Sequence, residues 1–205
     1  MPYVHAIKDY YEELWERLPD HVALPDRERR LAFLLDEVSA GDRVLDLGSG
    51  DGTFTAELAR ADAQPVGVEI AEAAMRRARA AHPELDFRLT PIHGPLPLED
   101  CEFDLVWASE VIEHVADTAL WLSEVRRVLS PGGKLLLTTP NHPRAALLVR
   151  GLERYSDPLG DHLHLYTRRL LHDLLHEFAF EPVRVQTAAG PPLLRRLLLA
   201  QAVRS

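Results

Sequence analysis

The chain has 205 residues, so we expect a single domain that spans residues 1–205 and buries a full hydrophobic core. Hydrophobic residues make up 46% of the chain and charged residues 27%, which excludes disordered and fibrous proteins. The net charge of -9 argues against a nucleic-acid partner, because proteins that bind phosphate backbones normally carry a basic face.

Cysteine usage and hydropathy bear on the compartment. The lone cysteine, Cys101, cannot form an intrachain disulfide, which favours a reducing environment. The first residues are charged where a signal peptide would be apolar. No apolar run approaches the roughly 20 residues of a membrane helix, so we expect no transmembrane segment. These features predict a cytoplasmic protein.

The hydrophobic spacing predicts helices that alternate with strands. Residues 1–40 are expected to hold two N-terminal helices, one over 4–18 and one from an N-cap at Asp26 to a stop at Gly41. Strands are expected at 43–47, 65–69, 85–89, 103–108, 134–138 and 182–187. Further helices are expected at 54–60, 71–81, 118–129 and 168–179, with Asp117 and Thr167 as N-caps of the last two. This order predicts an α/β fold with a mostly parallel, doubly wound sheet and a site at the carboxyl ends of its strands.

A glycine-rich loop follows the first predicted strand and leads into a helix, with the sequence Asp46-Leu47-Gly48-Ser49-Gly50-Asp51-Gly52. Glycines there let the backbone approach a ligand closely and place the N-terminus of the next helix against it. Glu69 ends the second strand about 20 residues after Gly50, where a carboxylate that binds ribose hydroxyls is expected. The loop and Glu69 therefore predict a nucleotide or nucleoside site.

Carboxylates beside the loop indicate which nucleotide the site takes. Asp46 and Asp51 would repel a pyrophosphate, whereas S-adenosylmethionine has no phosphate and carries a sulfonium and an ammonium. A purely structural explanation is that Asp46 orders the turn and Glu69 caps the next helix. The strand–loop–helix context favours S-adenosylmethionine as the cofactor.

Four segments resemble, in order, successive motifs of the class I S-adenosylmethionine-dependent methyltransferases: Val44–Gly52, Val66–Ile70, Phe103–Val115 and Val125–Asn141. The nearest branch is the one that contains the ubiquinone-biosynthesis O-methyltransferases. The resemblance covers most of residues 40–187. It implies a Rossmann-like methyltransferase domain with the strand order 3-2-1-4-5 and a final hairpin at the sheet edge.

The same resemblance implies a set of cofactor-binding residues. Asp46 would support the amino acid part of the cofactor, and Glu69 would bind its ribose. Ile70 and the main chain near Ile92 would contact its adenine. The other residues in this set are Gly48, Ser49, Gly50 and Gly52 of the loop and Ser109 after the fourth strand.

Two features depart from the family's pattern. An Asp that often bonds the adenine amino group is absent from residues 89–94, so adenine would rely on the main chain near Ile92 and on apolar packing. Only one strand is evident near the end of the chain, so we expect a cofactor-binding core over 41–189 and a C-terminal tail over 190–205. The tail would leave out the last strand or replace it with a helix. It could pack on the domain, on a second subunit to form a homodimer, or on a membrane surface.

A second polar group follows the fourth predicted strand. Glu110, Glu113 and His114 would share one face of a helix, about one turn apart. Two carboxylates and an imidazole fit Mg²⁺ or Mn²⁺ better than a metal that prefers thiolates. The spacing, followed later by Asp161-His162, resembles the metal site of small-RNA 3′-terminal 2′-O-methyltransferases. That resemblance implies Glu110, Glu113, His114 and His162 as metal ligands.

A catalytic site without metal explains the same residues, and we favour it over the metal site. His114 would then be the general base, because an imidazole titrates near neutral pH, with Glu110 and Glu113 beside it. Glutamates in a first helical turn also stabilise the helix dipole without any further role.

We therefore expect a methyltransferase that acts on a small-molecule acceptor, most simply at oxygen. One alternative is 2′-O-methylation of an RNA 3′ end. It predicts a basic patch that contains Arg144, Arg150, Arg154, Arg168 and Arg169. Another alternative is a non-catalytic module that binds S-adenosylmethionine, and a nicotinamide enzyme is a more distant one.

Two segments outside the motifs are candidates for covering the site. Tyr10, Tyr11 and Trp15 of the first helix could form part of a lid over the cofactor or pack in the core. Residues 140–167 are a long connection of the kind that contacts substrates. The candidates there are Asn141, His142, Arg144 and Tyr155.

Overall fold

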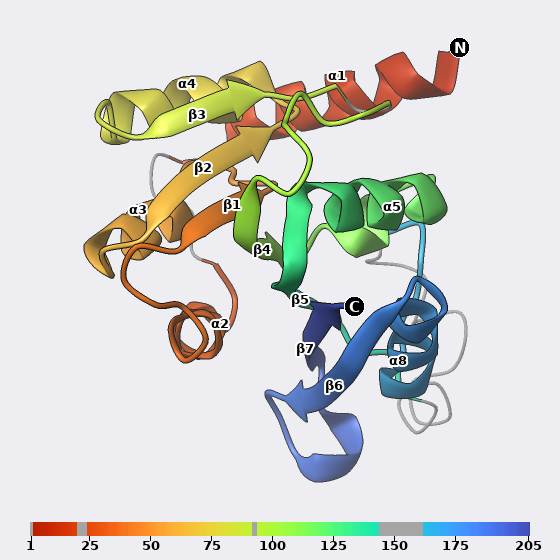
Figure 1. The fold of residues 1–205 in the computed structure, drawn as a ribbon. Coiled ribbons are helices and arrows are strands. Elements are labelled where there is room, and N and C mark those ends of the chain that lie inside the picture. The colour runs from red at the N-terminus through yellow and green to blue at the C-terminus, as the bar shows by residue number, and fades with distance from the viewer. Residues whose placement is uncertain (1, 20–23, 92–93, 144–161) are drawn as a thin grey trace.

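The computed structural model describes residues 2–19, 24–91, 94–143 and 162–205, which are the coloured parts of the ribbon in Figure 1. They form a seven-stranded sheet with the order β3-β2-β1-β4-β5-β7-β6. The sequence-based prediction of a mostly parallel, Rossmann-like sheet is therefore confirmed. The strands are β1 (Arg43–Leu47), β2 (Gln64–Glu69), β3 (Asp86–Leu89), β4 (Phe103–Ser109), β5 (Leu129–Pro140), β6 (Phe180–Ala188) and β7 (Leu197–Arg204).

The first five strands are parallel and the last two are antiparallel to their neighbours. β1 pairs with β2 on one side and with β4 on the other. β3 and β5 extend the sheet outwards in the same direction. β7 runs antiparallel between β5 and β6. The carboxyl ends of β1 to β5 therefore meet along one edge, which is where ligands bind in sheets of this kind.

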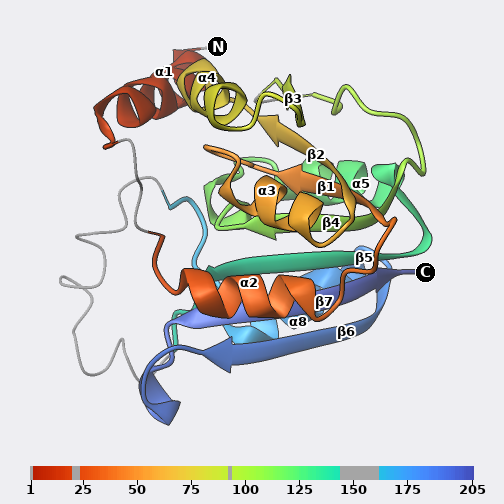
Figure 2. The same ribbon diagram turned by 90° about the vertical axis from the view of Figure 1, so that its left-hand side faces the viewer.

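Helices cover both faces of the sheet. The helices are α1 (Pro2–Arg17), α2 (Arg27–Leu35), α3 (Thr53–Arg60), α4 (Glu72–Ala81), α5 (Thr118–Val128) and α8 (Arg168–Glu177), with short 3₁₀ turns η1 (Ile112–His114) and η2 (Pro192–Leu194). α2 and α3 lie on one face, and α5 and α8 lie on the other (Figure 2). α1 packs along α4.

Three predicted N-cap residues precede the helices α2, α5 and α8, and two of them cap the helix with a side-chain hydrogen bond. The Asp117 side chain accepts a hydrogen bond from the backbone amide of Leu120, and the Thr167 hydroxyl accepts one from Leu170. Both N-cap predictions are confirmed. Asp26 is the N-cap residue of α2, as predicted, but it has a left-handed backbone, with φ of 53°, and makes no side-chain cap hydrogen bond. Its carboxylate instead pairs with Arg196 at 3.0 Å.

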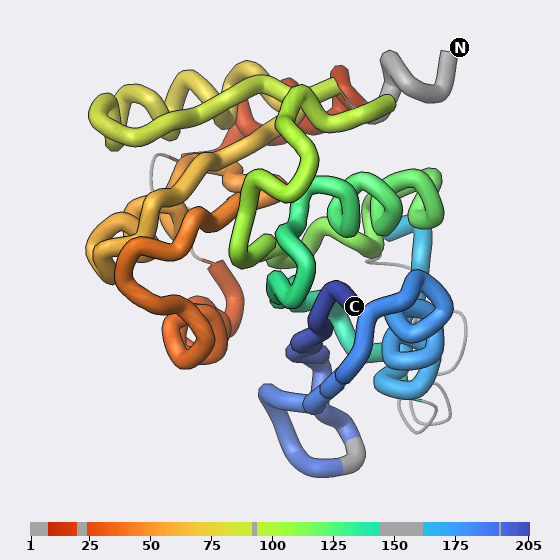
Figure 3. The backbone as a smooth tube through the Cα atoms, viewed as in Figure 1, coloured from red at the N-terminus to blue at the C-terminus, as the bar shows by residue number. Residues whose placement is uncertain are grey.

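The end of the chain is a strand of the sheet. Leu197–Arg204 forms β7, whose backbone pairs with β5 and β6 along its length. In the tube view of Figure 3 this strand lies inside the sheet, with the C-terminus at its end. The expectation that residues 190–205 form a tail outside the sheet was therefore wrong. The sequence misleads here because a short apolar run that is buried on both faces cannot be told from a buried helix by its pattern.

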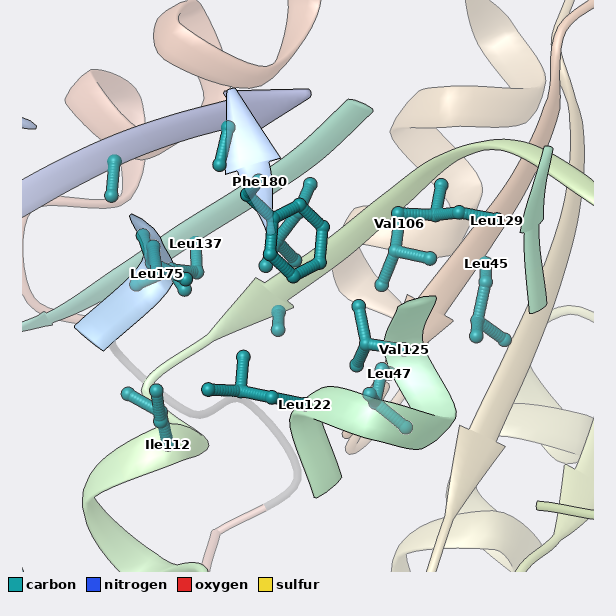
Figure 4. Close-up of a cluster of buried hydrophobic side chains, with 14 of the residues drawn as sticks. Leu45, Leu47, Val106, Ile112, Leu122, Val125, Leu129, Leu137, Leu175 and Phe180 are labelled. Carbon is teal, nitrogen blue, oxygen red and sulfur yellow. The ribbon is translucent and has the colours of Figure 1, made fainter. Parts of the chain in front are cut away.

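The main hydrophobic core lies between the sheet and the helices α5 and α8. Figure 4 shows Leu45, Val106 and Leu137 from the strands facing Leu122 of α5 and Leu175 of α8. A second core, around Trp107 and Leu34, fills the space under α2 and α3. Burying these side chains, at about 25 cal/mol per Å² of apolar surface, stabilises the layers and fixes the strand ends. No helix in the described ranges has the length and apolar character needed to cross a bilayer.

Candidate active site

A cavity of about 430 Å³ lies at the carboxyl ends of the parallel strands. Its wall combines residues from the two polar groups that the sequence singles out. The glycine-loop side consists of Gly48–Asp51 and Glu69, and the glutamate side consists of Ser109, Glu110 and His114. Apolar residues from α1 and from the segment after it form a further part of the wall, namely Leu14, Trp15, Leu18 and Leu24. The two sequence-predicted groups therefore face one space.

Two glycines of the loop, Gly48 and Gly50, leave no room for a side chain. Gly48 has φ of 82°, and a Cβ there would lie 2.6 Å from Cγ2 of Val111. Gly50 has φ of 55°, and a Cβ there would lie 2.9 Å from the Trp15 ring. Both glycines line the cavity, as predicted. Gly52 is not on the cavity wall, and a Cβ there would meet the Phe87 ring, so its place beside the cofactor stays a prediction.

Three backbone amides fix the carboxylate of Glu69. Oε2 accepts a hydrogen bond from Gly50 at 3.0 Å, and Oε1 accepts bonds from Ile70 at 2.7 Å and Ala71 at 3.0 Å. Burial raises the pKa of Glu69, and these amides oppose the increase. The side chain thus joins the loop after β1 to the start of α4, and both Glu69 and Ile70 line the cavity.

Asp46 lies behind the loop rather than on the cavity wall. Its carboxyl is buried, and Oδ2 accepts a hydrogen bond from the Thr55 hydroxyl at 2.6 Å. Burial raises the pKa of Asp46 to about 7. Ser49 is buried as well but lies on the wall. The support that Asp46 gives to the cofactor stays a prediction.

Arg30 of α2 occupies the glutamate side, and no sequence motif had identified it. Its guanidinium pairs with Glu110 Oε2 at 3.1 Å and lies 3.4 Å from the Ser109 hydroxyl. Thr138 completes the network, because its hydroxyl donates to Glu110 Oε1 at 3.0 Å. Arg30 is only 5% exposed, and its buried Nε has no hydrogen-bond partner in the described chain. A buried cation on the wall is suited to an anionic group of a ligand.

The predicted helix through Glu110, Glu113 and His114 was wrong. Glu110 has a left-handed backbone, with φ of 56°, and its amide donates to the carbonyl of Thr138. Only the 3₁₀ turn Ile112–His114 follows. The three side chains therefore do not share a helical face. Glu110 turns to Arg30, and Glu113 turns into the interior.

Glu113 is fully buried beneath the cavity. Its Oε2 accepts a hydrogen bond from the Thr139 hydroxyl at 2.8 Å, and Oε1 has no hydrogen-bond partner among the described residues. Burial raises the pKa of Glu113, and the negative charge of Glu110 raises it further. The carboxyl lies under His114, with Oε1 at 3.8 Å from Nε2.

Two imidazoles converge above Glu113. The His114 and His162 rings meet edge to face with centroids 4.8 Å apart, and Tyr11 of α1 lies 6.0 Å from His114. Potential ligand atoms of Glu113, His114 and His162 all lie within 4.8 Å of one another. Three of the four predicted metal ligands are thus brought together, and Glu110 is kept apart by Arg30.

Helix α1 contributes to the cavity wall and is held by α4 through Glu12 and through Leu18, the residue that follows Arg17. The Glu12 carboxylate accepts hydrogen bonds from the backbone amides of Glu72 at 2.6 Å and Ala73 at 2.9 Å, at the N-terminus of α4. Arg77 of α4 donates to the carbonyl of Leu18 at 2.6 Å. Of the predicted lid aromatics, Tyr11 and Trp15 line the cavity. These contacts show how α1 is placed over the site.

The remaining sequence candidates lie elsewhere. Asn141 donates to the carbonyl of Arg195, and His142 is buried near Tyr166, so neither faces the cavity. Arg168 and Arg169 are exposed at the start of α8. The candidates that lie outside the described residues are Ile92, Arg144, Arg150, Arg154 and Tyr155.

Comparison with known proteins assigns the family. The family model described as a methyltransferase domain matches residues 14–185. A ubiquinone biosynthesis O-methyltransferase of Xanthomonas oryzae pv. oryzae is 32% identical over 156 residues, which are 68% of this chain and 64% of that protein. The chain spans between 38% and 64% of the length of the first curated relatives that it matches.

Solved structures share the fold. An S-adenosylmethionine-dependent methyltransferase from Mesorhizobium loti has a TM-score of 0.70 at 21% identity, covering 89% of this chain and 99% of that chain. Phosphoethanolamine N-methyltransferase 2 of Haemonchus contortus, in complex with S-adenosyl-L-methionine, has a TM-score of 0.71 at 18% identity. The match covers 86% of this chain and 52% of that chain. Since most of its length matches the family model, the chain belongs to the methyltransferase-domain family and has the class I, S-adenosylmethionine-dependent fold.

Proposed function

We propose that this chain transfers the methyl group of S-adenosylmethionine to an oxygen of a small-molecule acceptor. One observation carries the proposal: the glycine loop, Glu69 and His114 line the same cavity. A nucleoside held on the glycine-loop side would therefore present its reactive end to an imidazole. The name of the Xanthomonas relative supports transfer to oxygen, and the apolar wall from α1 suits an aromatic ring.

The residues on the wall fit the cofactor. Gly48 and Gly50 let the backbone approach it, and the Glu69 carboxylate can accept hydrogen bonds from the ribose hydroxyls. Arg30 lies on the wall beside Glu110, and in this proposal its guanidinium attracts the carboxylate of the methionyl part. When bound, S-adenosylmethionine supplies a methyl group activated by a positively charged sulfur.

His114 takes the proton of the acceptor hydroxyl in this proposal. Its ring lies on the cavity wall between Tyr11 and His162, which restrict its orientation. Glu113 lies beneath it and would stabilise the charged imidazole that forms. Methyl transfer is an in-line displacement, so the walls formed by α1 and the loop contribute mainly by aligning the acceptor.

A metal at Glu113, His114 and His162 is a second way to activate the acceptor. Ligands about 2.1 Å from a metal lie at most about 4.2 Å apart, so the three side chains would have to close slightly. Two imidazoles and one carboxylate suit Mn²⁺ better than Mg²⁺, which prefers oxygen. Calorimetry with MnCl₂ on the wild type and on His162→Ala tests this: saturable binding lost in the variant supports the metal, and no heat contradicts it.

The test of the proposal measures transfer and binding separately. Methyl-labelled S-adenosylmethionine is incubated with the protein and with catechol, 3,4-dihydroxybenzoate or a short RNA. Label should enter a phenol and not the RNA. His114→Asn should lower the rate by about 10²–10⁴-fold, while adenosylhomocysteine affinity stays within about twofold. His176→Asn, on the exposed surface of α8, is the matched control and should retain full activity.

Two outcomes contradict the proposal. Label that enters the RNA 3′ end in preference to the phenols would favour the 2′-O-methyltransferase alternative. Tight adenosylhomocysteine binding, with no transfer to any acceptor and no effect of His114→Asn, would identify a non-catalytic binding module.

A further inference from the structure

Arg196 lies just before β7, away from the cavity wall, and pairs with a residue 170 positions earlier in the chain. Its Nη2 donates to both carboxylate oxygens of Asp26, at 3.1 Å and 3.0 Å. The Asp26 side chain is 18% exposed and the Arg196 side chain 66%. The pair therefore joins the C-terminal hairpin of the sheet, β6 and β7, to the residue that precedes α2.

The backbone of Arg196 is fixed by both of its polar groups. Its amide donates to the carbonyl of Ala189 at 2.9 Å, and its carbonyl accepts the amide of Asn141 at 2.8 Å. The side chain of Asn141 also donates to the carbonyl of Arg195, at 2.7 Å. Asn141 directly follows β5, whose carboxyl end lies at the edge of the sheet where the cavity is. The guanidinium of Arg196 therefore extends from a backbone that is anchored to this edge.

Asp26 connects this anchor to the cavity wall. Its carbonyl accepts the backbone amide of Arg30 at 3.1 Å, in the first turn of α2. Its own backbone is left-handed, a conformation that costs free energy for residues other than glycine. Leu24 and Pro25, the two residues before it, line the cavity. A carboxylate held by Arg196 therefore stabilises a turn that borders the cavity and begins the helix of Arg30.

Helix α2 contacts the same hairpin a second time. Phe33 packs against the apolar cluster that contains Leu197 and Leu199 of β7. Arg30 comes between the two contacts along the helix, and its side chain is buried and pairs with Glu110. The hairpin therefore sets the place from which the Arg30 guanidinium reaches the wall.

We infer that Arg196 positions Arg30 for the carboxylate of the cofactor's methionyl part. Charge-assisted hydrogen bonds depend on distance and angle, so a shift at the start of α2 weakens the attraction of Arg30 for that carboxylate. The nucleoside would not be affected, because Glu69 is held by the amides of Gly50 and of residues 70–71. This inference rests on the proposed function, because it presumes an adenosyl ligand whose amino acid part meets Arg30.

The test measures the binding of two ligands that differ in the amino acid part. Adenosylhomocysteine carries the carboxylate, and 5′-methylthioadenosine has the same nucleoside and sulfur without it. Arg196→Gln removes the charge that holds Asp26, and Arg196→Lys keeps a charge there. Arg184→Gln, the same substitution at an exposed residue of β6, is the matched control. All affinities are measured by calorimetry.

We expect Arg196→Gln to weaken adenosylhomocysteine binding about three- to fivefold, because a partly exposed ion pair contributes modestly. Arg196→Lys and the control should bind it as the wild type does, and every variant should bind methylthioadenosine equally. Asp26→Asn should match Arg196→Gln, and the double variant should be no weaker than either single variant.

A general loss of structure would appear in both ligands. Equal weakening of adenosylhomocysteine and methylthioadenosine by Arg196→Gln, or no weakening of either, would therefore overturn the inference. Additive losses in the double variant would overturn it as well, because Arg196 would then not act through Asp26. A wild type that binds neither ligand would instead reject the proposed function, so the two failures are distinguishable.

Discussion

The two polar sides of the cavity are built in different ways. On the glycine-loop side, the Glu69 carboxylate is held by backbone amides from the loop and from residues 70–71. On the glutamate side, Glu110 is held by the side chains of Arg30 and Thr138, and Glu113 by the hydroxyl of Thr139. Backbone amides are present whatever the side chains are, whereas a side-chain network is lost with any one member. The glutamate side should therefore be the more sensitive to substitution.

The largest effect is expected for Arg30→Ala. It would leave the Glu110 carboxylate in the wall without its cation, and removing one partner of a buried ion pair typically costs roughly 3–5 kcal/mol. Urea denaturation should show this loss in the free energy of unfolding. Glu110→Gln in the Arg30→Ala background should restore part of it, because the uncompensated charge is gone. An Arg30→Ala protein as stable as the wild type would contradict the described network.

The second effect concerns pH and Asp46. Burial raises the pKa of Asp46 to about 7 from 3.8, so between these pH values the unfolded chain is ionised while the folded chain keeps its proton. Folding stability should therefore fall as pH rises from about 4 to about 7, by up to about 4 kcal/mol. Asp46→Asn removes the titration. Denaturation midpoints measured from pH 4.5 to 7.5 should decline less steeply in the variant than in the wild type. If both declined equally, Asp46 would not be the cause of the pH dependence.

Glu69→Gln tests the glycine-loop side directly. The amide nitrogen of glutamine cannot accept a hydrogen bond, so one group of backbone amides loses its partner and the ribose loses an anionic acceptor. We expect adenosylhomocysteine to bind about 10- to 30-fold more weakly by calorimetry, since hydrogen bonds to charged groups are worth about 1.5–3 kcal/mol. The melting temperature should fall less than in Arg30→Ala. A larger fall in melting temperature for Glu69→Gln than for Arg30→Ala would contradict the claim that the glutamate side is the more sensitive to substitution.

The smallest effect is expected for Glu12→Gln in α1. Glu12 caps the N-terminus of α4 from outside the helix, and the loss of such a cap costs about 1 kcal/mol. The weaker attachment of α1 should increase the dissociation rate of adenosylhomocysteine a few-fold in stopped-flow fluorescence. Glu13→Gln, at the exposed pair with Arg17, is the control and should leave the rate unchanged. Equal rates in both variants would show that α1 does not limit ligand release.

Local patterns explain why the glycine-loop side could be predicted from the sequence. Gly48, Gly50 and Glu69 act through spacing along one strand–loop–helix–strand segment, so their neighbours in sequence are also their neighbours in space. The parallel sheet followed from the alternation of strands and helices, whereas the order of its strands followed from the resemblance to the methyltransferase family. Asp117 and Thr167 were recognised as caps because a cap acts within three residues.

Long-range contacts explain what the sequence left out. Arg30 pairs with Glu110, which is remote in sequence, and Glu12 caps a helix that is remote in sequence as well, so neither leaves a local pattern. The spacing of Glu110, Glu113 and His114 suited a helix, but the backbone of Glu110 bonds to β5 instead. β7 was missed because its buried leucines lack the alternation of a half-exposed strand.

Calorimetric titration of the wild type with adenosylhomocysteine and with NAD⁺, at equal concentrations, tests most directly that the cavity accepts a phosphate-free nucleoside that carries an amino acid. Adenosylhomocysteine should bind saturably at one site, and NAD⁺ should give no measurable binding. Saturable binding of NAD⁺, with no response to adenosylhomocysteine, would contradict the assignment of the cavity and every role given to its residues.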